Sequence, residues 1–175
     1  MSCDIAIGAN RVQPCTSTNG GNEVFYPFNF INDAFTVVGG IATAMNAALT
    51  VAYNYDIAGD GNTLTQSSVS DYKTGTSVVT QTVVNQLKKV DGASNFELTK
   101  LSQGKNSGIL KDRNGVYHWV GHENGFNVTR TIEAVSGGAR ADFNGYNVTL
   151  VAENKVLAPT LDAATITAFL AIVTA

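Results

Sequence analysis

The stretch DRNGVYHWVGHENGFNVTRTIEAVSGGARADFNGYNVTL, residues 112–150, decides the fold class of this chain. It holds three Asn-Gly pairs, at 114–115, 124–125 and 144–145. Asn-Gly supplies the positive φ angles that tight hairpin turns need. The segments that follow the pairs largely alternate between apolar and polar side chains. Because alternation with a period of two is typical of half-buried strands, the stretch predicts an antiparallel meander.

The chain upstream of this stretch also carries strand patterns. Residues 23–30 and 35–38 predict two short strands. Because Pro27 cannot donate a backbone hydrogen bond, the first strand is expected at a sheet edge or with a bulge. Residues 49–57 alternate, with the odd-numbered apolar side chains on one face. Residues 76–90 are rich in Thr and Val and are much longer than the usual strand of five or six residues. We expect there a bent ribbon or a strand that extends beyond its own domain.

Two segments have helical signals. Ser94 and Glu97 fit a capping box, which predicts a helix over about residues 95–103. Residues 160–175 fit a second helix capped by Thr160, although their β-branched content also allows an edge strand. The expected fold is mainly β: an antiparallel sandwich or barrel with one flanking helix, an extended N-terminal arm and a C-terminal segment that favours a helix.

The composition indicates a surface that other subunits cover. The chain has 175 residues, enough for one β domain over residues 1–175, with residues 1–22 and 160–175 as arms. Charged residues make up 14% of the chain, against about 25% in average soluble domains. A sparsely charged surface is expected where subunits pack against each other.

Several classes of protein are disfavoured. The pI is about 5.2 and the largest basic cluster is the pair Lys88-Lys89, so recognition of nucleic acid by concentrated positive charge is not expected. Residues 34–55 lack charge, but Gly39-Gly40 and several polar residues interrupt them, so we expect no membrane partner. We expect Cys3 and Cys15 to be reduced, with a disulfide between them as the open alternative.

The search for catalytic, metal or cofactor sites predicts none. His118, His122 and Glu123 are the best candidates, but imidazoles four residues apart on a strand lie about 13 Å apart and cannot share one metal ion. A small group of strand aromatics is interpreted as core, with a carbohydrate platform as the alternative: Tyr26, Phe28, Phe30, Tyr53 and Tyr55.

Much of the chain resembles one family. The segments that carry the likeness are residues 87–89, 97–101, 112–117, 120–128, 137–150 and 158–159, together with Ser2-Cys3-Asp4, Pro14-Cys15 and Gly20-Gly21 near the start. They resemble the tail tube proteins, or major tail proteins, of tailed bacteriophages. The chain departs from the family pattern over residues 160–175, which are longer and richer in Ala and Thr.

The resemblance implies a structural protein of the virion, not an enzyme. Six copies of a β-sandwich subunit with a flanking helix would form a ring, and stacked rings would form the tail tube. Strands from all subunits would line its lumen, and a long loop and the terminal arms would reach the neighbouring ring. Implied partners are the chain itself, other tail proteins, and transiently DNA and the tape-measure protein. The tube would assemble in the cytoplasm of the host bacterium. A mildly acidic chain suits a channel through which DNA slides, because like charges repel.

Three sets of residues are candidates for assembly contacts. The Gly, Asn and Ser content of residues 58–72 predicts a loop between rings, represented by Ala58, Asp60, Asn62, Leu64, Ser68 and Tyr72. The candidate barrel strand between subunits is represented by Val79, Gln81, Val83 and Asn85. The candidate arm contacts are Ile5, Ile7, Phe169 and Leu170.

Two other functions remain as alternatives, and an enzyme is the least favoured. A capsid decoration or head-completion protein would share the β fold and the low charge. A carbohydrate-binding module or receptor-binding tip would use the aromatic strands, and Tyr53→Ala would then remove glycan binding without loss of fold.

Overall fold

The structure is a computed structural model that describes residues 11, 18–57 and 59–174. It is mainly β, as predicted. Its elements, in chain order, are β1 (Asn22–Asn29), β2 (Phe35–Val38), β3 (Ile41–Met45), β4 (Ala52–Tyr53), β5 (Tyr55–Asp56), β6 (Thr63–Asp71), β7 (Thr76–Lys88), α1 (Gly92–Gln103), β8 (Asn106–Asp112), β9 (Tyr117–Val120), β10 (Thr129–Val135), β11 (Gly145–Asn154), β12 (Thr160–Leu161), α2 (Ala163–Leu170) and β13 (Val173–Thr174).

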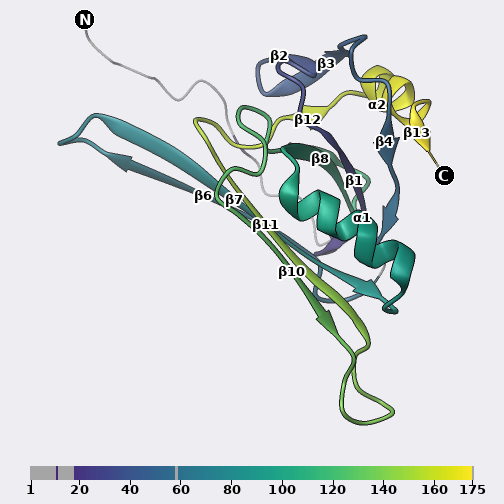
Figure 1. Cartoon of the computed structure of the whole chain (residues 1–175). Helices are drawn as coiled ribbons and strands as arrows, with labels where there is room; N and C mark the ends of the chain where they lie inside the picture. The colour runs from purple at the N-terminus through teal and green to yellow at the C-terminus, as the bar shows by residue number, and fades with distance from the viewer. Residues whose placement is uncertain (1–10, 12–17, 58, 175) are drawn as a thin grey trace, which may run out of the picture.

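Two sheets form a sandwich-like arrangement (Figure 1). The first, which we call the body sheet, has the strand order β2-β3-β12-β9-β8-β1-β5. The second, which we call the long sheet, has the order β10-β11-β7-β6 and all its neighbours are antiparallel. β13 and β4 form a separate two-stranded sheet. Over the described residues the sandwich prediction is confirmed, and the sheets do not close into a barrel.

Apolar side chains gather in two clusters, one on each side of the body sheet. The first includes Phe25, Val83 and Tyr146, with Leu98 of α1, and fills the space between the two sheets. The second lies under α2 and is dominated by aromatic rings that meet mostly edge to face: Tyr26, Phe28, Phe35, Trp119 and Phe169. The C-terminal helix therefore covers the face of the body sheet that the long sheet leaves open.

Both helices form, but with caps other than those predicted. α1 begins at Gly92, and Asp91 caps it by accepting the Ser94 N–H at 2.8 Å. The Ser94–Glu97 capping box is wrong: the Ser94 hydroxyl donates to Asp91, and Glu97 pairs with Lys100. The helix in the C-terminal segment is confirmed as α2. Its cap is Asp162, while Thr160 lies in β12.

The predicted meander is split between the two sheets. Asn114-Gly115 does turn the β8–β9 hairpin, where Gly115 has a φ of 79°. Asn124-Gly125 instead lies in the crossover from β9 in the body sheet to β10 in the long sheet. The alternation over residues 49–57 also fails in part, because Ala52 is buried while Val51 and Tyr53 are exposed.

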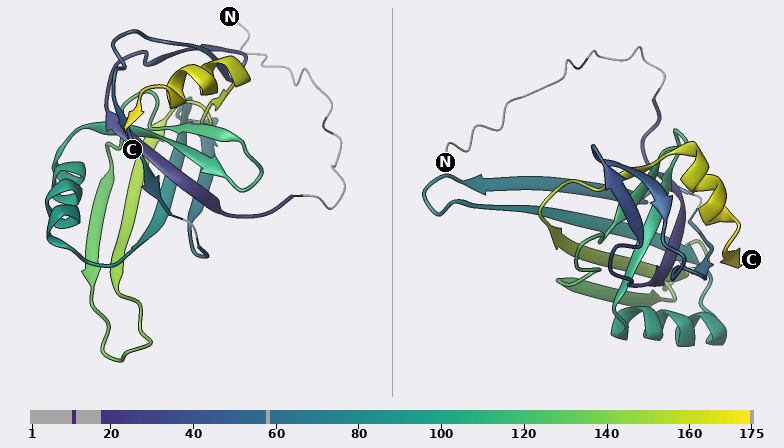
Figure 2. Two further views of the ribbon diagram at one scale, coloured as in Figure 1. Left: turned by 90° about the vertical axis from the view of Figure 1, so that its right-hand side faces the viewer. Right: turned by 90° about the horizontal axis from the view of Figure 1, so that it is seen from above.

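The segment over residues 58–72, which was predicted as a loop between rings, is mostly a strand, and its role between rings stays a prediction. Residues 63–71 form β6 and pair along their whole length with β7. Asp71 closes the turn by accepting the N–H groups of Lys73 and Gly75. The far half of this hairpin projects beyond the other described elements in Figure 1 and in the right view of Figure 2. Thr and Val favour extended backbone, and a Thr- and Ser-rich strand stays soluble when both faces are wet.

Candidate assembly surface

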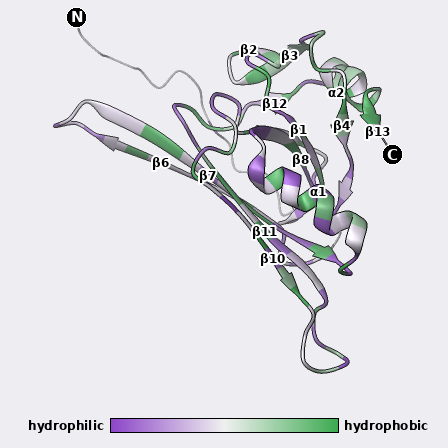
Figure 3. Ribbon diagram, viewed as in Figure 1, coloured by the Kyte–Doolittle hydropathy of each residue, from purple (hydrophilic) through white to green (hydrophobic). Residues whose placement is uncertain are grey.

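The side of the long sheet that faces away from the core is covered by short, mostly uncharged side chains. Burial alternates along β7 and β11, so even-numbered residues of β7 and odd-numbered residues of β11 point outward. The register then sets cross-strand rows, for example Thr65–Thr82–Val151–Thr129 and Thr63–Val84–Thr149–Thr131. We call this side the outer face. Figure 3 shows polar and apolar residues mixed along these strands.

The outer face is weakly acidic. Glu133 and Glu153 belong to it by register, and Lys88 stands at its end as the last residue of β7. Arg130 points to the opposite side, where its guanidinium donates to the carbonyl oxygen of Gly104. Over its described residues, the outer face therefore has no cluster of Lys and Arg side chains of the kind that binds phosphate groups.

Both long edges of this sheet are strands with one neighbour. β10 pairs with β11 and β6 pairs with β7, and no other described strand joins either edge. Unpaired N–H and C=O groups along an edge are a template for pairing with another chain. Because the four strands alternate in direction, β6 of one copy beside β10 of another would continue the antiparallel order.

The candidate barrel strand lies in this sheet but not at its edge. Val79, Gln81, Val83 and Asn85 all belong to β7, which pairs with β11 on one side and β6 on the other. All four side chains are buried and point toward the core. These side chains therefore pack within the chain, and the outward residues of β7 are Thr80, Thr82, Val84 and Gln86. The assignment of β7 to a barrel shared between subunits stays a prediction.

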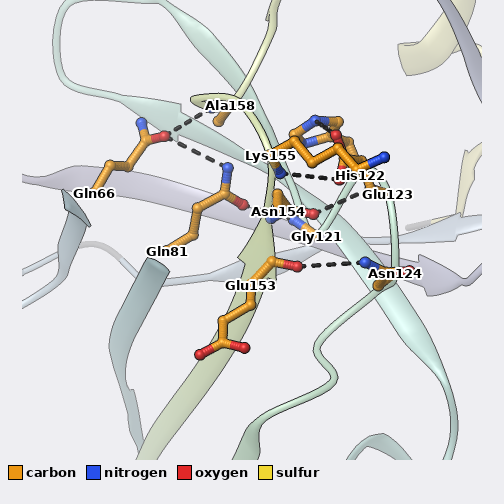
Figure 4. Close-up of polar contacts among 10 residues, drawn as sticks. All are labelled: Gln66, Gln81, Gly121, His122, Glu123, Asn124, Glu153, Asn154, Lys155 and Ala158. Atoms are coloured by element: carbon orange, nitrogen blue, oxygen red, sulfur yellow. Dashed lines mark hydrogen bonds and ion pairs between the residues drawn. The ribbon is translucent and has the colours of Figure 1, made fainter. Parts of the chain in front are cut away.

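A polar network on the inner side ties the long sheet to the sheet-to-sheet crossover (Figure 4). Gln81 is fully buried, and its side-chain oxygen accepts the Gly121 N–H at 3.0 Å. Its amide nitrogen lies 3.5 Å from the Gln66 oxygen, which also accepts the Ala158 N–H at 2.7 Å. The two glutamines thus fix β6, β7 and the crossover relative to one another.

The other half of this network surrounds His122. The Glu123 N–H donates to Asn154, and the Glu123 carboxylate accepts the Lys155 N–H at 2.9 Å. The His122 side chain is 8% exposed, and its Nε2 lies 3.7 Å from Glu123 Oε1. Burial lowers the pKa of His122, and the nearby Glu123 charge opposes this effect more weakly.

The two histidines do not form a common site. His118 Nε2 lies 3.5 Å from Asp112 Oδ2, at the other end of β9. Within the described ranges, no group of three or more His, Cys, Asp or Glu side chains is placed to hold a metal ion. No described helix is long and apolar enough to cross a membrane.

The remaining candidates of residues 58–72 have different environments. Tyr72 is fully exposed at the hairpin tip. Asp60 pairs with Arg113 at 3.1 Å. Asn62 is buried, and its side chain accepts the Gln86 N–H at 2.7 Å, which anchors the start of β6. Leu64 and Ser68 lie within β6, and Ala58 lies outside the described residues.

The arm candidates separate in the same way. Phe169 is buried among the rings of its own chain, so its prediction as a contact between subunits is corrected. Leu170 is exposed. Ile5, Ile7 and both cysteines lie outside the described residues.

Sequence reasoning missed β10 as an edge strand. The Thr-x-Thr spacing of residues 129–131 indicated a strand, but only the pairing shows that β10 has β11 as a neighbour on one side and no described strand on the other. Searches against protein families, curated proteins and solved structures find no match to this chain.

Proposed function

We propose that this chain is a subunit of the tail tube of a tailed bacteriophage, assembled in the host cytoplasm and resident in the virion tail. The observation that supports this most is the long sheet, which combines two open edges with a wet, weakly acidic outer face. The resemblance of residues 87–159 to major tail proteins points the same way.

Ring formation would remove the open edges. If β6 of each subunit pairs with β10 of the next, every strand gains a neighbour on both sides. Six copies of a four-stranded sheet give a barrel of 24 strands. With strands about 4.8 Å apart and tilted by roughly 40°, that barrel is about 45–50 Å across at the backbone. It is wide enough for duplex DNA.

The outer face would then line the lumen. Threonine hydroxyls hydrate the wall without concentrating charge, and Glu133 and Glu153 repel phosphates. Passage of DNA requires that no sequence-specific or strong electrostatic contact form, since phosphate binding relies on clustered Lys and Arg.

The projecting β6–β7 hairpin would make the contact between rings. Its tip carries exposed apolar side chains, Val69, Val78 and Tyr72, on a strand pair that has no core beneath it. Burying these side chains against a neighbouring ring would stabilise the stack, since each square ångström of apolar surface removed from water contributes about 25 cal/mol.

A trimmed hairpin tests this role. Val69 and Val78 face each other, so residues 70–77 can be replaced by Asn-Gly, which closes a two-residue hairpin turn. Negative-stain electron microscopy over a concentration series should show tubes for the natural chain and separate rings for the trimmed chain. Tubes of normal length from the trimmed chain would contradict the hairpin role.

A proline at the β6 edge tests ring closure. The Lys89 N–H donates to Asn144, so odd-numbered residues of β7 bond toward β11 and even-numbered residues bond toward β6. Even-numbered residues of β6 then direct their N–H groups to the open edge. Ser68→Pro removes such a group and should abolish rings, while Ser68→Ala should keep them. If the natural chain stays a monomer or trimer at high concentration, that result would overturn the tail tube proposal and favour a capsid decoration role.

A further inference from the structure

A wide groove lies between α1 and the β4–β5 segment and has no part in the role proposed above. Its volume is about 800 Å³. Tyr53 and Tyr55 form one wall with Asn54 and Asp56, and Glu97 and Lys100 of α1 form the other. The end of β7 and the following Lys89 complete the lining. Apart from Gln86 and Lys88, these residues lie away from the outer face of the long sheet.

The two tyrosines present a fixed aromatic wall. Tyr53 is 49% exposed, which corrects its interpretation as a core residue. Tyr55 is half-buried and packs edge to face on Phe25, with ring centroids 6.2 Å apart. Burial raises the pKa of Tyr55. The phenol can donate a hydrogen bond. An aromatic ring with a polar tip suits a ligand that is apolar on one face and polar at its rim.

The groove has a net charge opposite in sign to that of the whole chain. Three lysines line it, against two carboxylates, although the whole chain has a formal net charge of -3. Lys100 is held by Glu97 at 2.9 Å. Lys89 has a φ of 69°, and its N–H donates to Asn144 at 2.8 Å, so its backbone is fixed beside the groove. The groove therefore attracts an anion.

We propose that this groove binds an acidic oligosaccharide. The C–H face of a sugar ring stacks on Tyr53, the Tyr55 phenol donates a hydrogen bond to a hydroxyl, and Lys89 attracts a sugar carboxylate. A peptide fits less well, because β5, the nearest edge of the body sheet, has only two residues to offer a main chain. This proposal is independent of tube assembly.

The first test is calorimetric titration of the full-length protein with a tetrasaccharide of galacturonic acid. The matched ligands are the neutral galactose tetrasaccharide and a tetraglutamate peptide. We expect saturable binding of the acidic sugar, at least tenfold weaker binding of the neutral sugar, and none of the peptide. Equal binding of the peptide would show attraction by charge alone and overturn the proposal, as would no binding of the acidic sugar.

Variants with matched controls locate the site. Tyr53→Ala should weaken binding at least tenfold and Tyr53→Phe should retain it. Lys89→Gln should weaken binding severalfold and reduce its dependence on salt. Lys73→Gln, at the distant hairpin tip, should leave binding unchanged. Circular dichroism confirms that each variant is folded. Unchanged binding by folded Tyr53→Ala would refute the site.

Discussion

Phe169→Ala should destabilise the isolated subunit strongly. The side chain is 0% exposed and meets the rings of Tyr26, Phe28 and Phe35 with centroids 5.6–6.3 Å apart. Truncation of a buried phenylalanine costs about 3–5 kcal/mol, from lost burial and the cavity left behind. Domains of this size are stable by about 5–15 kcal/mol, so the change removes a large part of the total.

Urea unfolding of monomeric protein at low concentration measures this loss. Leu170→Ala is the matched control, because the next residue of the same helix is exposed and its truncation should cost less than about 1 kcal/mol. Phe169→Leu keeps most of the side-chain volume and should lower the free energy of unfolding by about 1.5 kcal/mol. This variant can still be measured if Phe169→Ala fails to fold.

The result that refutes the reasoning is a loss below about 1 kcal/mol for Phe169→Ala. In that case the ring would not be part of the core. If such a variant also failed to assemble, Phe169 would be an arm contact between subunits, as the sequence alone suggested.

Three further predictions concern the inner network and the close approach of strands. His122 has a lowered pKa in the folded state, so below about pH 6.5 the unfolded chain takes up a proton that the folded chain resists. Stability should therefore fall as pH drops below 6.5, by at most about 1.4 kcal/mol per pH unit, and the fall should be smaller in His122→Gln; parallel curves from urea unfolding at pH 5–7 would contradict this. Gln81→Leu leaves the buried Gly121 N–H without its acceptor and should lower the free energy of unfolding by about 1–3 kcal/mol in the same assay. Thr82→Val on the outer face is the near-neutral control. Gly145→Ala places its Cβ 2.1 Å from the Leu87 carbonyl oxygen and should cost about 1–3 kcal/mol, whereas Gly138→Ala meets nothing closer than 3.7 Å; equal melting temperatures would show that β11 and β7 can separate without loss.

Local features of the fold could be read from the residues. The β8–β9 hairpin follows from Asn114-Gly115, and α2 follows from the apolar spacing of the C-terminal segment. The helix caps could not be read as well. Both Asp91 and Ser94 suit an N-cap, and the structure selects Asp91, whose carboxylate accepts the N–H and hydroxyl of Ser94.

The candidate assembly surface was only partly predictable. The unusual length of the segment after Thr76 correctly indicated a strand that extends beyond the body of the domain. The pattern did not show that Val79, Gln81, Val83 and Asn85 face the core, because these residues alternate with residues of similar size and polarity. In a Thr- and Val-rich strand, period-two spacing identifies two faces but does not say which one is wet.

The sequence by itself determined the mainly β class, the two helices and the low charge, because hydrogen-bonding geometry and side-chain propensity act over a few neighbouring residues. The tertiary structure decided which strands share a sheet, which of them stand at its edges, and which face meets water. These depend on pairings between distant segments, such as β11 with β7 and the Gln81 contact with Gly121. No local pattern encodes them, since each strand could pair with several others until the shared core excludes all but one arrangement.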